Sequence, residues 1–162
     1  MALRFQVSEI AMRYRLYHPA DFAALYAIEE VCFEPPFRFG RLYMRGLVNA
    51  RHSATWIAED GGRMAGFAIV EWTARGKTVS AYLQTIEVLP EFRVQGVGQE
   101  LLARTEYSAR KADALVLWLH VDESNAAAIR LYERQGFTAA GKEEHYYAEG
   151  RGALLYRKEL TE

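Results

Sequence analysis

The sequence predicts a mixed α/β fold, with one mostly antiparallel sheet flanked by helices. Three observations predict it. Segments with apolar residues at helical spacing alternate with segments rich in β-forming residues. Asp60-Gly61-Gly62 supplies a hairpin turn between two of the strand segments. The 162 residues, 51% of them hydrophobic, suffice for a core that buries about 70% of the unfolded chain's surface. With no repeat, low-complexity tract or linker, we expect one domain over residues 1–162.

The first quarter of the chain predicts a strand and two helices. Residues 1–10 show no clear period and stay open between a flexible extension and a strand. β-formers predict a first strand at 13–17, after which Pro19 and Asp21 begin a helix that runs to about Phe33. A second helix is expected at 40–49. Its predicted inner face consists of Leu42, Tyr43, Leu47 and Val48.

Three antiparallel strands are expected next, at 55–59, 64–72 and 78–88. In the third strand, simple alternation places one set of side chains on each face of the sheet. The first set is Tyr82, Gln84, Ile86 and Val88, and the second is Leu83, Thr85 and Glu87.

The second half alternates helices and strands. A helix is predicted at 99–111, and the nearly uniform apolar run 115–121 predicts a strand buried on both faces. A further helix at 125–135 should end at Gly136, a left-handed cap, before two final strands separated near 149–152. The predicted order along the chain is β-α-α-β-β-β-α-β-α-β-β.

Charge and cysteine content exclude several classes of protein. A net charge of −1 provides no overall attraction to nucleic acid or an anionic membrane, so neither is an expected partner. A single cysteine, Cys32, excludes an internal disulfide and fits a reducing compartment. Its carboxylate neighbours disfavour a reactive thiolate, so we interpret it as a packing residue. No signal peptide or membrane span is recognised, and the expected location is cytoplasmic.

The most specific motif is Arg93-x-x-Gly96-x-Gly98, between a predicted strand and a predicted helix. A glycine-bearing turn at a helix start presents unpaired backbone N–H groups to an anion, and the helix dipole assists. Taken alone, the motif is equally compatible with a bare structural junction. It lacks the third glycine of a dinucleotide-binding loop and the Gly-Lys-Ser/Thr of a P-loop.

Together with the segment from Asn125 to Phe137, this motif resembles the two linked signatures of the GNAT N-acetyltransferases, and 29–37 and Tyr146-Tyr147 resemble their RimI-like branch. The resemblance implies the GNAT fold, acetyl-CoA as co-substrate and no metal. It implies that the loop at 94–99 binds the CoA pyrophosphate and that backbone groups at 86–88 bind the pantetheine arm. It also implies that Asn125 contacts CoA. The implied CoA-binding residues are Ile86, Glu87, Val88, Arg93, Val94, Gln95, Gly96, Val97, Gly98, Gln99, Asn125 and Tyr132.

The same resemblance suggests the catalytic groups. Tyr132 matches a tyrosine near the CoA sulfur and is expected to protonate the leaving thiolate; otherwise it is a core aromatic. His120 is the expected general base, with Tyr82 sharing that role, and a satisfied core histidine is the alternative. Glu87 is the rival base. The four histidines show no metal-ligand spacing, so no metal site is expected.

A protein or peptide N-terminal α-amine is the predicted acceptor. Its slot would be formed by Phe33, Pro36, Phe37, Tyr146 and Tyr147. The sequence shows no cluster of carboxylates around the centre to attract a lysine. Gly152 stands where RimI-like enzymes usually have an aspartate, so the acceptor stays open. A small-molecule or polyamine acetyltransferase and a non-catalytic CoA-binding module remain alternatives, and both monomer and homodimer are open.

Overall fold

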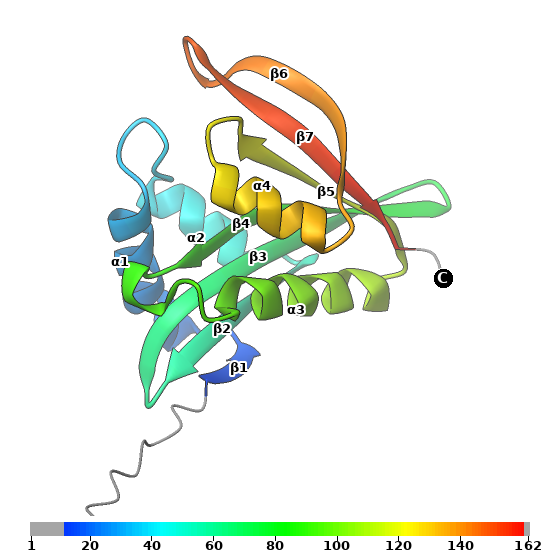
Figure 1. Ribbon diagram of the computed structural model, residues 1–162. Coiled ribbons are helices and arrows are strands. Elements are labelled where there is room, and N and C mark those ends of the chain that lie inside the picture. Colours follow the sequence, from blue (N-terminus) through cyan, green and yellow to red (C-terminus); the bar gives the residue numbers. More distant parts are fainter. Residues whose placement is uncertain (1–11, 161–162) are drawn as a thin grey trace, which may run out of the picture.

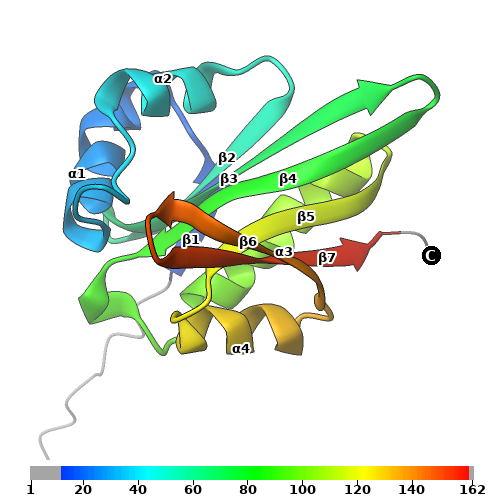
Figure 2. The same ribbon diagram turned by 90° about the horizontal axis from the view of Figure 1, so that it is seen from above.

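The computed structural model describes residues 12–160, so the expectation for residues 1–10 lies outside the described residues. One seven-stranded sheet has the order β1-β2-β3-β4-β5-β7-β6, and β4–β5 is its parallel pair. Helices α1 and α2 cover one face and α3 and α4 the other, as Figure 2 shows most clearly (Figures 1 and 2). None of the helices within 12–160 is long and apolar enough to cross a membrane. The strands are β1 (Met12–Leu16), β2 (Ser53–Asp60), β3 (Arg63–Arg75), β4 (Thr78–Val88), β5 (Ala114–Asp122), β6 (Thr138–Ala148) and β7 (Arg151–Glu159); the helices are α1 (Phe22–Cys32), α2 (Arg41–Asn49), α3 (Val97–Lys111) and α4 (Ala126–Arg134).

The predicted order of elements is confirmed, and local chemistry explains where several helices begin. His18 and Asp21 form a reciprocal capping box on the short 3-10 turn that leads into α1. The side chain of Asn125 accepts a hydrogen bond from the N–H of Ala128 and caps α4. Gly136 follows α4 with a φ of 89°, the left-handed conformation predicted for it.

Two predicted faces are only partly right. On α2, the prediction is confirmed for Leu47, which is buried, and for Val48, which packs against the core. It is wrong for Leu42, which is 86% exposed, and for Tyr43, which is 54% exposed, and Met44 is buried instead. The helix therefore meets the sheet through a stripe rotated from the predicted one. On β5, one face is buried through Leu117, Leu119 and Val121, but the other is only partly covered. The partly covered face is the one that carries His120.

Both faces of the sheet contribute to the core. Fully buried residues such as Leu25 of α1 and Leu101 of α3 pack on opposite sides of the central strands. Burying one such side chain contributes about 1.5–3 kcal/mol. The packed helices thus fix the central strands, and with them the side chains that face the α1–α2 side.

A β-bulge in β4 changes which side chains share a face. Ile69 of β3 pairs with Thr85, but the next residue, Val70, pairs with Leu83, so Gln84 is the extra residue. Leu83 packs on the α3 side, whereas Glu87 contacts α1. The simple alternation predicted for 82–88 is therefore wrong beyond Leu83.

β4 and β5 diverge next to this bulge. Their parallel pairing runs from Val79–Ala114 to Leu83–Leu119 and ends there. Leu89 donates its N–H to Ala65 of β3, so the neighbouring Val88 directs its own N–H and C=O away from β3, toward the side where β5 has separated. Backbone groups of β4 that have no partner on β5, the N–H of Val88 among them, thus line an opening in the sheet.

Candidate active site

The predicted anion-binding loop lies at the N-terminus of α3. Gly96 has a φ of 81° and precedes the helix, which begins at Val97, two residues earlier than predicted. No side chain caps this end, and the first intrahelical bond runs from the N–H of Glu100 to the carbonyl of Gly96. The first-turn N–H groups of a 15-residue helix therefore have no intrahelical acceptor, which is the arrangement that binds phosphate.

Two side chains of this loop have unexpected positions. Val94 has a φ of 61° and a fully exposed side chain, a strained backbone conformation for a β-branched residue. Arg93 turns back to the end of β4, where its Nε donates to the carbonyl of Val88 at 2.9 Å. Arg93 therefore anchors the loop to the strand that borders the opening.

His120 and Tyr82 meet on the α1–α2 side of the sheet, from strands β5 and β4. The hydroxyl oxygen of Tyr82 lies 2.6 Å from Nδ1 of His120. The His120 side chain is 14% exposed, and the ring of Tyr146 stacks on it at 4.3 Å between centroids. Burial, followed by the nearby Tyr146 hydroxyl, raises the pKa of Tyr82 and keeps it a neutral phenol. A phenol bonded to an imidazole can pass a proton to it.

Glu87 lies on the same face but in a closed environment. Its side chain is almost fully buried, and one carboxylate oxygen accepts a hydrogen bond from the hydroxyl of Thr85 at 2.9 Å. Its other oxygen has no partner within the described residues apart from the carboxyl of Glu29, which α1 places beside it. Burial, then Glu29, raises the pKa of Glu87 well above its usual range. The pair therefore shares a proton, because two adjacent buried carboxylates cannot both ionise cheaply.

Glu29 connects this pair to the loop that follows α1. Its other oxygen accepts the N–H of Phe39 at 2.7 Å, and the hydroxyl of Tyr26 donates to the carbonyl of Phe39 at 3.0 Å. Cys32 packs nearby, and burial, followed by Glu87, raises the pKa of its thiol to about 11. The prediction that Cys32 is not a reactive thiolate thus agrees with its surroundings.

Tyr132 is 7% exposed and belongs to the core on the α3–α4 side, where it packs edge-on against Phe137. Burial raises the pKa of its phenol, and Tyr147 adds to the shift. The residue is therefore both a core aromatic and a neutral phenol. The alternative prediction from the sequence, that Tyr132 is a core aromatic residue, therefore describes the position of its ring.

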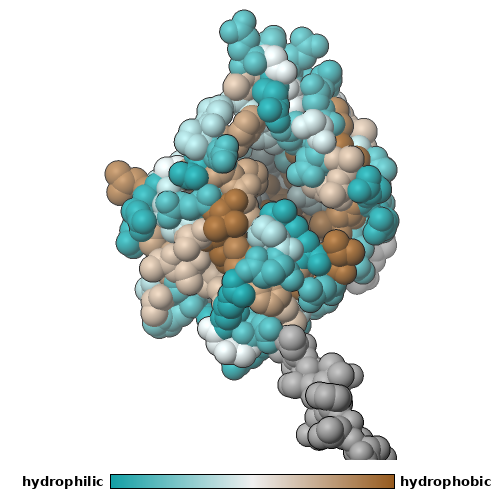
Figure 3. Space-filling model, turned by 60° about the vertical axis from the view of Figure 1, so that its left-hand side comes forward, coloured by the Kyte–Doolittle hydropathy of each residue, from teal (hydrophilic) through white to brown (hydrophobic). Residues whose placement is uncertain are grey.

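The predicted acceptor walls come together in space. Phe37, in the loop between α1 and α2, contacts Tyr147 of β6 at 5.5 Å between ring centroids. The guanidinium of Arg151 lies 4.7 Å from the centroid of Phe37 and pairs with Asp122 at 2.6 Å. Figure 3 shows this side of the molecule hollowed below the projecting β6–β7 hairpin. The loop between α1 and α2 and the β6–β7 hairpin are therefore in contact.

Carboxylates lie closer to the centre than the sequence indicated, which corrects the prediction that none gather there. Oε1 of Glu143, on β6, lies 3.0 Å from Nε2 of His120. A Cβ atom on Gly152 would lie 3.5 Å from the carboxylate of Glu123, which also pairs with Lys142 at 2.9 Å. Glu123 thus places a carboxylate beside the position where Gly152 lacks one.

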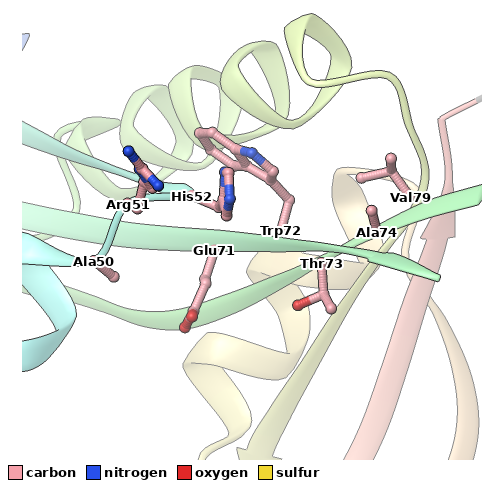
Figure 4. Close-up of a pocket in the computed structure, with 8 residues that line it drawn as sticks. All are labelled: Ala50, Arg51, His52, Glu71, Trp72, Thr73, Ala74 and Val79. Carbon is pink, nitrogen blue, oxygen red and sulfur yellow. The ribbon is translucent and has the colours of Figure 1, made fainter.

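A separate shallow cavity of about 380 Å³ lies where β2 begins beside the β3–β4 hairpin (Figure 4). In Figure 4, Arg51, His52 and Trp72 point toward the α3 side, and Glu71 points the other way. None of the predicted site residues lines it. The described part of the chain also holds no group of three or more His, Cys, Asp or Glu suited to a metal ion.

Sequence reasoning missed two partners, Glu143 and Glu29. The contact of Glu143 depends on the register of β6, which is irregular between Glu143 and Ala148 and includes His145 at a φ of 58°. No local sequence pattern indicates this contact with His120. Glu29 lies in the first predicted helix, four residues after Leu25 and three before Cys32, so a glutamate at apolar helical spacing was a detectable signal.

The fold and the loop at the start of α3 define a class of protein, and comparison with known families agrees. The Acetyltransferase (GNAT) family model matches residues 22–137, and the chain belongs to this family.

Individual relatives of this chain have more specific names than the family model. The chain is 41% identical over 86 residues to the [ribosomal protein bS18]-alanine N-acetyltransferase of Escherichia coli K12, covering 53% of this chain and 55% of that protein. It is 36% identical over 107 residues to the streptothricin acetyltransferase of Streptomyces lavendulae, covering 63% and 56%. The match thus spans about half the length of these relatives. The crystal structure of the E. coli S18-alanine enzyme superposes with a TM-score of 0.82 at 27% identity, covering 94% of this chain and 96% of that one.

Proposed function

We propose that this protein transfers an acetyl group from acetyl-CoA to a primary amine, and that the preferred amine is the α-amine of a protein or peptide. The observation that carries this proposal is the 2.6 Å contact between Tyr82 and His120 beside the β4–β5 divergence, which supports a role for the two residues in accepting a proton. We also propose a single domain and a cytoplasmic location, as the sequence indicates.

Acetyl-CoA fits the residues present. The uncapped first turn of α3 suits a diphosphate, and the backbone of Ile86 and the N–H of Val88, which have no partner on β5, suit an amide-bearing arm. Asn125 uses its side-chain oxygen as a helix cap, which leaves its NH₂ group for a ligand. When bound, acetyl-CoA supplies an activated thioester. The N–H of Val88 would polarise its carbonyl oxygen.

The chain's own residues would manage the protons. Tyr82 and His120 would take the proton that the amine loses as it attacks, and Tyr132 would give its proton to the departing sulfur. The raised pKa of Tyr132 suits a group that must stay protonated until that moment. Burial beside Glu29 raises the pKa of Glu87, so Glu87 would keep its proton and serve a structural role rather than act as the base.

An α-amine suits this centre better than a lysine. At pH 7, forming the neutral amine costs about 1.4 kcal/mol for an α-amine and about 4.6 kcal/mol for lysine, because their ordinary pKa values are near 8 and 10.4. The contact between Phe37 and Tyr147 supports a slot for an extended N-terminus. The S18-alanine N-acetyltransferase relative is consistent with such an acceptor.

A small cationic amine is the second candidate. The carboxylates of Glu143, beside His120, and of Glu123, beside Gly152, favour it, as does the similarity to a streptothricin acetyltransferase. The test uses two matched peptides with acetyl-CoA: one with a free N-terminus and a blocked lysine, the other N-acetylated with a free lysine. We expect faster acetylation of the first. Faster acetylation of the second, or turnover with streptothricin or polyamines alone, would overturn the α-amine assignment and leave acetyl transfer intact.

A further inference from the structure

His120 has a second hydrogen-bonding partner that the proposed mechanism does not use. Its Nδ1 faces the hydroxyl of Tyr82 at 2.6 Å, and its Nε2 lies 3.0 Å from Oε1 of Glu143. The three side chains come from β4, β5 and β6, and the ring of Tyr146 holds the imidazole between them at 4.3 Å. The imidazole thus has a defined group at each nitrogen.

We propose that Glu143 is a positioning residue that fixes the tautomer of His120 so that Nδ1 can accept a proton from Tyr82. This inference rests on the proposed function, because it assigns a role in the same proton transfer. Glu143 itself touches neither the amine nor the thioester in this assignment. It acts through His120.

The chemistry of the three groups dictates the tautomer. The Glu143 side chain is 52% exposed, and a solvent-exposed carboxylate can only accept hydrogen bonds. In neutral His120, the single ring proton therefore belongs on Nε2, where Glu143 accepts it. Nδ1 then carries the lone pair and accepts from the hydroxyl of Tyr82.

Without the carboxylate, the tautomer would be undetermined. The hydroxyl of Tyr82 can donate or accept, so it is compatible with a proton on either nitrogen of His120. A proton on Nδ1 would block transfer from Tyr82. Fixing the proton on Nε2 thus makes the pair competent, as the buried carboxylate does in a serine-histidine-aspartate triad.

The proton balance follows from this arrangement. As the amine nitrogen forms its bond to the acetyl carbon, its proton passes to the oxygen of Tyr82, and the proton of Tyr82 passes to Nδ1 of His120. The C–S bond breaks, and the sulfur takes its proton from Tyr132. His120 ends as an imidazolium whose Nε2–H still points at Glu143, so the carboxylate also stabilises the charge that develops.

A purely architectural role is the alternative, in which Glu143 only ties β6 to β5. Two substitutions separate the roles. Glu143→Gln keeps a hydrogen bond to Nε2, and so the link from β6 to β5, but its amide can donate or accept and no longer fixes the tautomer. Glu143→Leu removes this hydrogen bond altogether. Glu144→Leu is the matched control, since Glu144 is the next residue on β6 and is exposed.

The first readout does not depend on activity. In protein labelled with ¹⁵N-histidine, NMR at about pH 8.5, two units above the ordinary imidazole pKa of about 6.5, reports which ring nitrogen of His120 is protonated. We expect the Nε2–H tautomer in the wild type and in Glu144→Leu, and a mixture of tautomers in Glu143→Gln and Glu143→Leu. An Nδ1–H tautomer in the wild type, or no change in Glu143→Leu, would overturn the inference.

The second readout is turnover with a peptide amine. Glu143→Leu should lower kcat by about 10- to 10²-fold, with the KM for acetyl-CoA unchanged, and Glu143→Gln by less. Glu144→Leu should stay within about twofold of the wild type. Wild-type turnover in Glu143→Leu together with an inactive His120→Ala would refute the role of Glu143 and leave the proposed function standing. Absence of wild-type turnover with every amine would instead refute the proposed function. The NMR measurement of the tautomer would still test the contact between His120 and Glu143.

Discussion

Replacing Glu87 by glutamine tests whether the buried carboxyl pair is structural or catalytic. In the wild type, Glu87 and Glu29 share a proton, and Glu87 also accepts from Thr85. A glutamine reproduces this pattern without a titrating group. Its NH₂ can donate to Glu29, and its carbonyl can accept from Thr85. We therefore expect the fold to be retained and turnover at pH 7 to stay within about threefold of the wild type.

The magnitude of the stability change follows from proton linkage. The pKa of Glu87 is raised in the folded protein, so the folded state holds a proton that the unfolded state releases above about pH 4.5. Wild-type stability therefore falls with rising pH by up to about 1.4 kcal/mol per pH unit, until the pH reaches the pKa of folded Glu87. Glu87→Gln does not suffer this loss. Between pH 5 and pH 7, the free energy of unfolding of Glu87→Gln should therefore rise relative to that of the wild type, by at most about 2.7 kcal/mol for one proton.

Urea denaturation of both proteins at pH 5, 6 and 7 measures this difference. Glu144→Gln, which alters an exposed carboxylate on β6, is the control and should follow the wild type at every pH. Parallel stability profiles for Glu87→Gln and the wild type would refute the shared proton. A loss of turnover of 10²-fold or more in Glu87→Gln, with the fold intact, would identify Glu87 as the general base and refute our assignment of His120.

Three further substitutions test other parts of the site. Gly96→Val forces a β-branched residue to a φ of 81° at the start of α3 and should weaken CoA binding at least tenfold by calorimetry, whereas unchanged affinity would argue against the phosphate-binding loop. Tyr132→Phe should lower kcat about 10²-fold with little change in the KM for acetyl-CoA, and an unchanged kcat would leave Tyr132 as a core aromatic only. Val94→Gly relieves a left-handed φ of 61° at a fully exposed residue and should raise the free energy of unfolding by about 0.5–1 kcal/mol, whereas a decrease would show that the strain there is negligible.

Local patterns predicted the elements but not all of the side-chain directions. Helical spacing, the turn at Asp60-Gly61-Gly62 and the glycine at 136 depend on nearby residues, and the structure confirms them. The face of Glu87 depends on one extra residue, Gln84, whose bulge is set by pairing with β3 rather than by the sequence around it. Periodicity therefore failed at that point.

In the candidate site, too, the sequence predicted some contacts and could not predict others. The meeting of Tyr82 and His120 was implied by the family resemblance, and the 2.6 Å contact is consistent with it. The contact of Glu143 with His120 joins residues 23 positions apart through an irregular hairpin, so no sequence spacing could predict it. The exposed Leu42 likewise depends on how α2 rotates against the sheet.

The pH dependence of kcat/KM for a peptide α-amine tests the central claim, a Tyr82–His120 centre that removes the proton of the amine. The neutral amine and the unprotonated base are both required, so the logarithm of kcat/KM should rise with a slope of two at acidic pH. We expect the slope to fall to one in His120→Ala, with an overall loss of about 10²- to 10⁴-fold, and to stay at two in Glu87→Gln. A slope of two in His120→Ala together with a slope of one in Glu87→Gln would contradict the account.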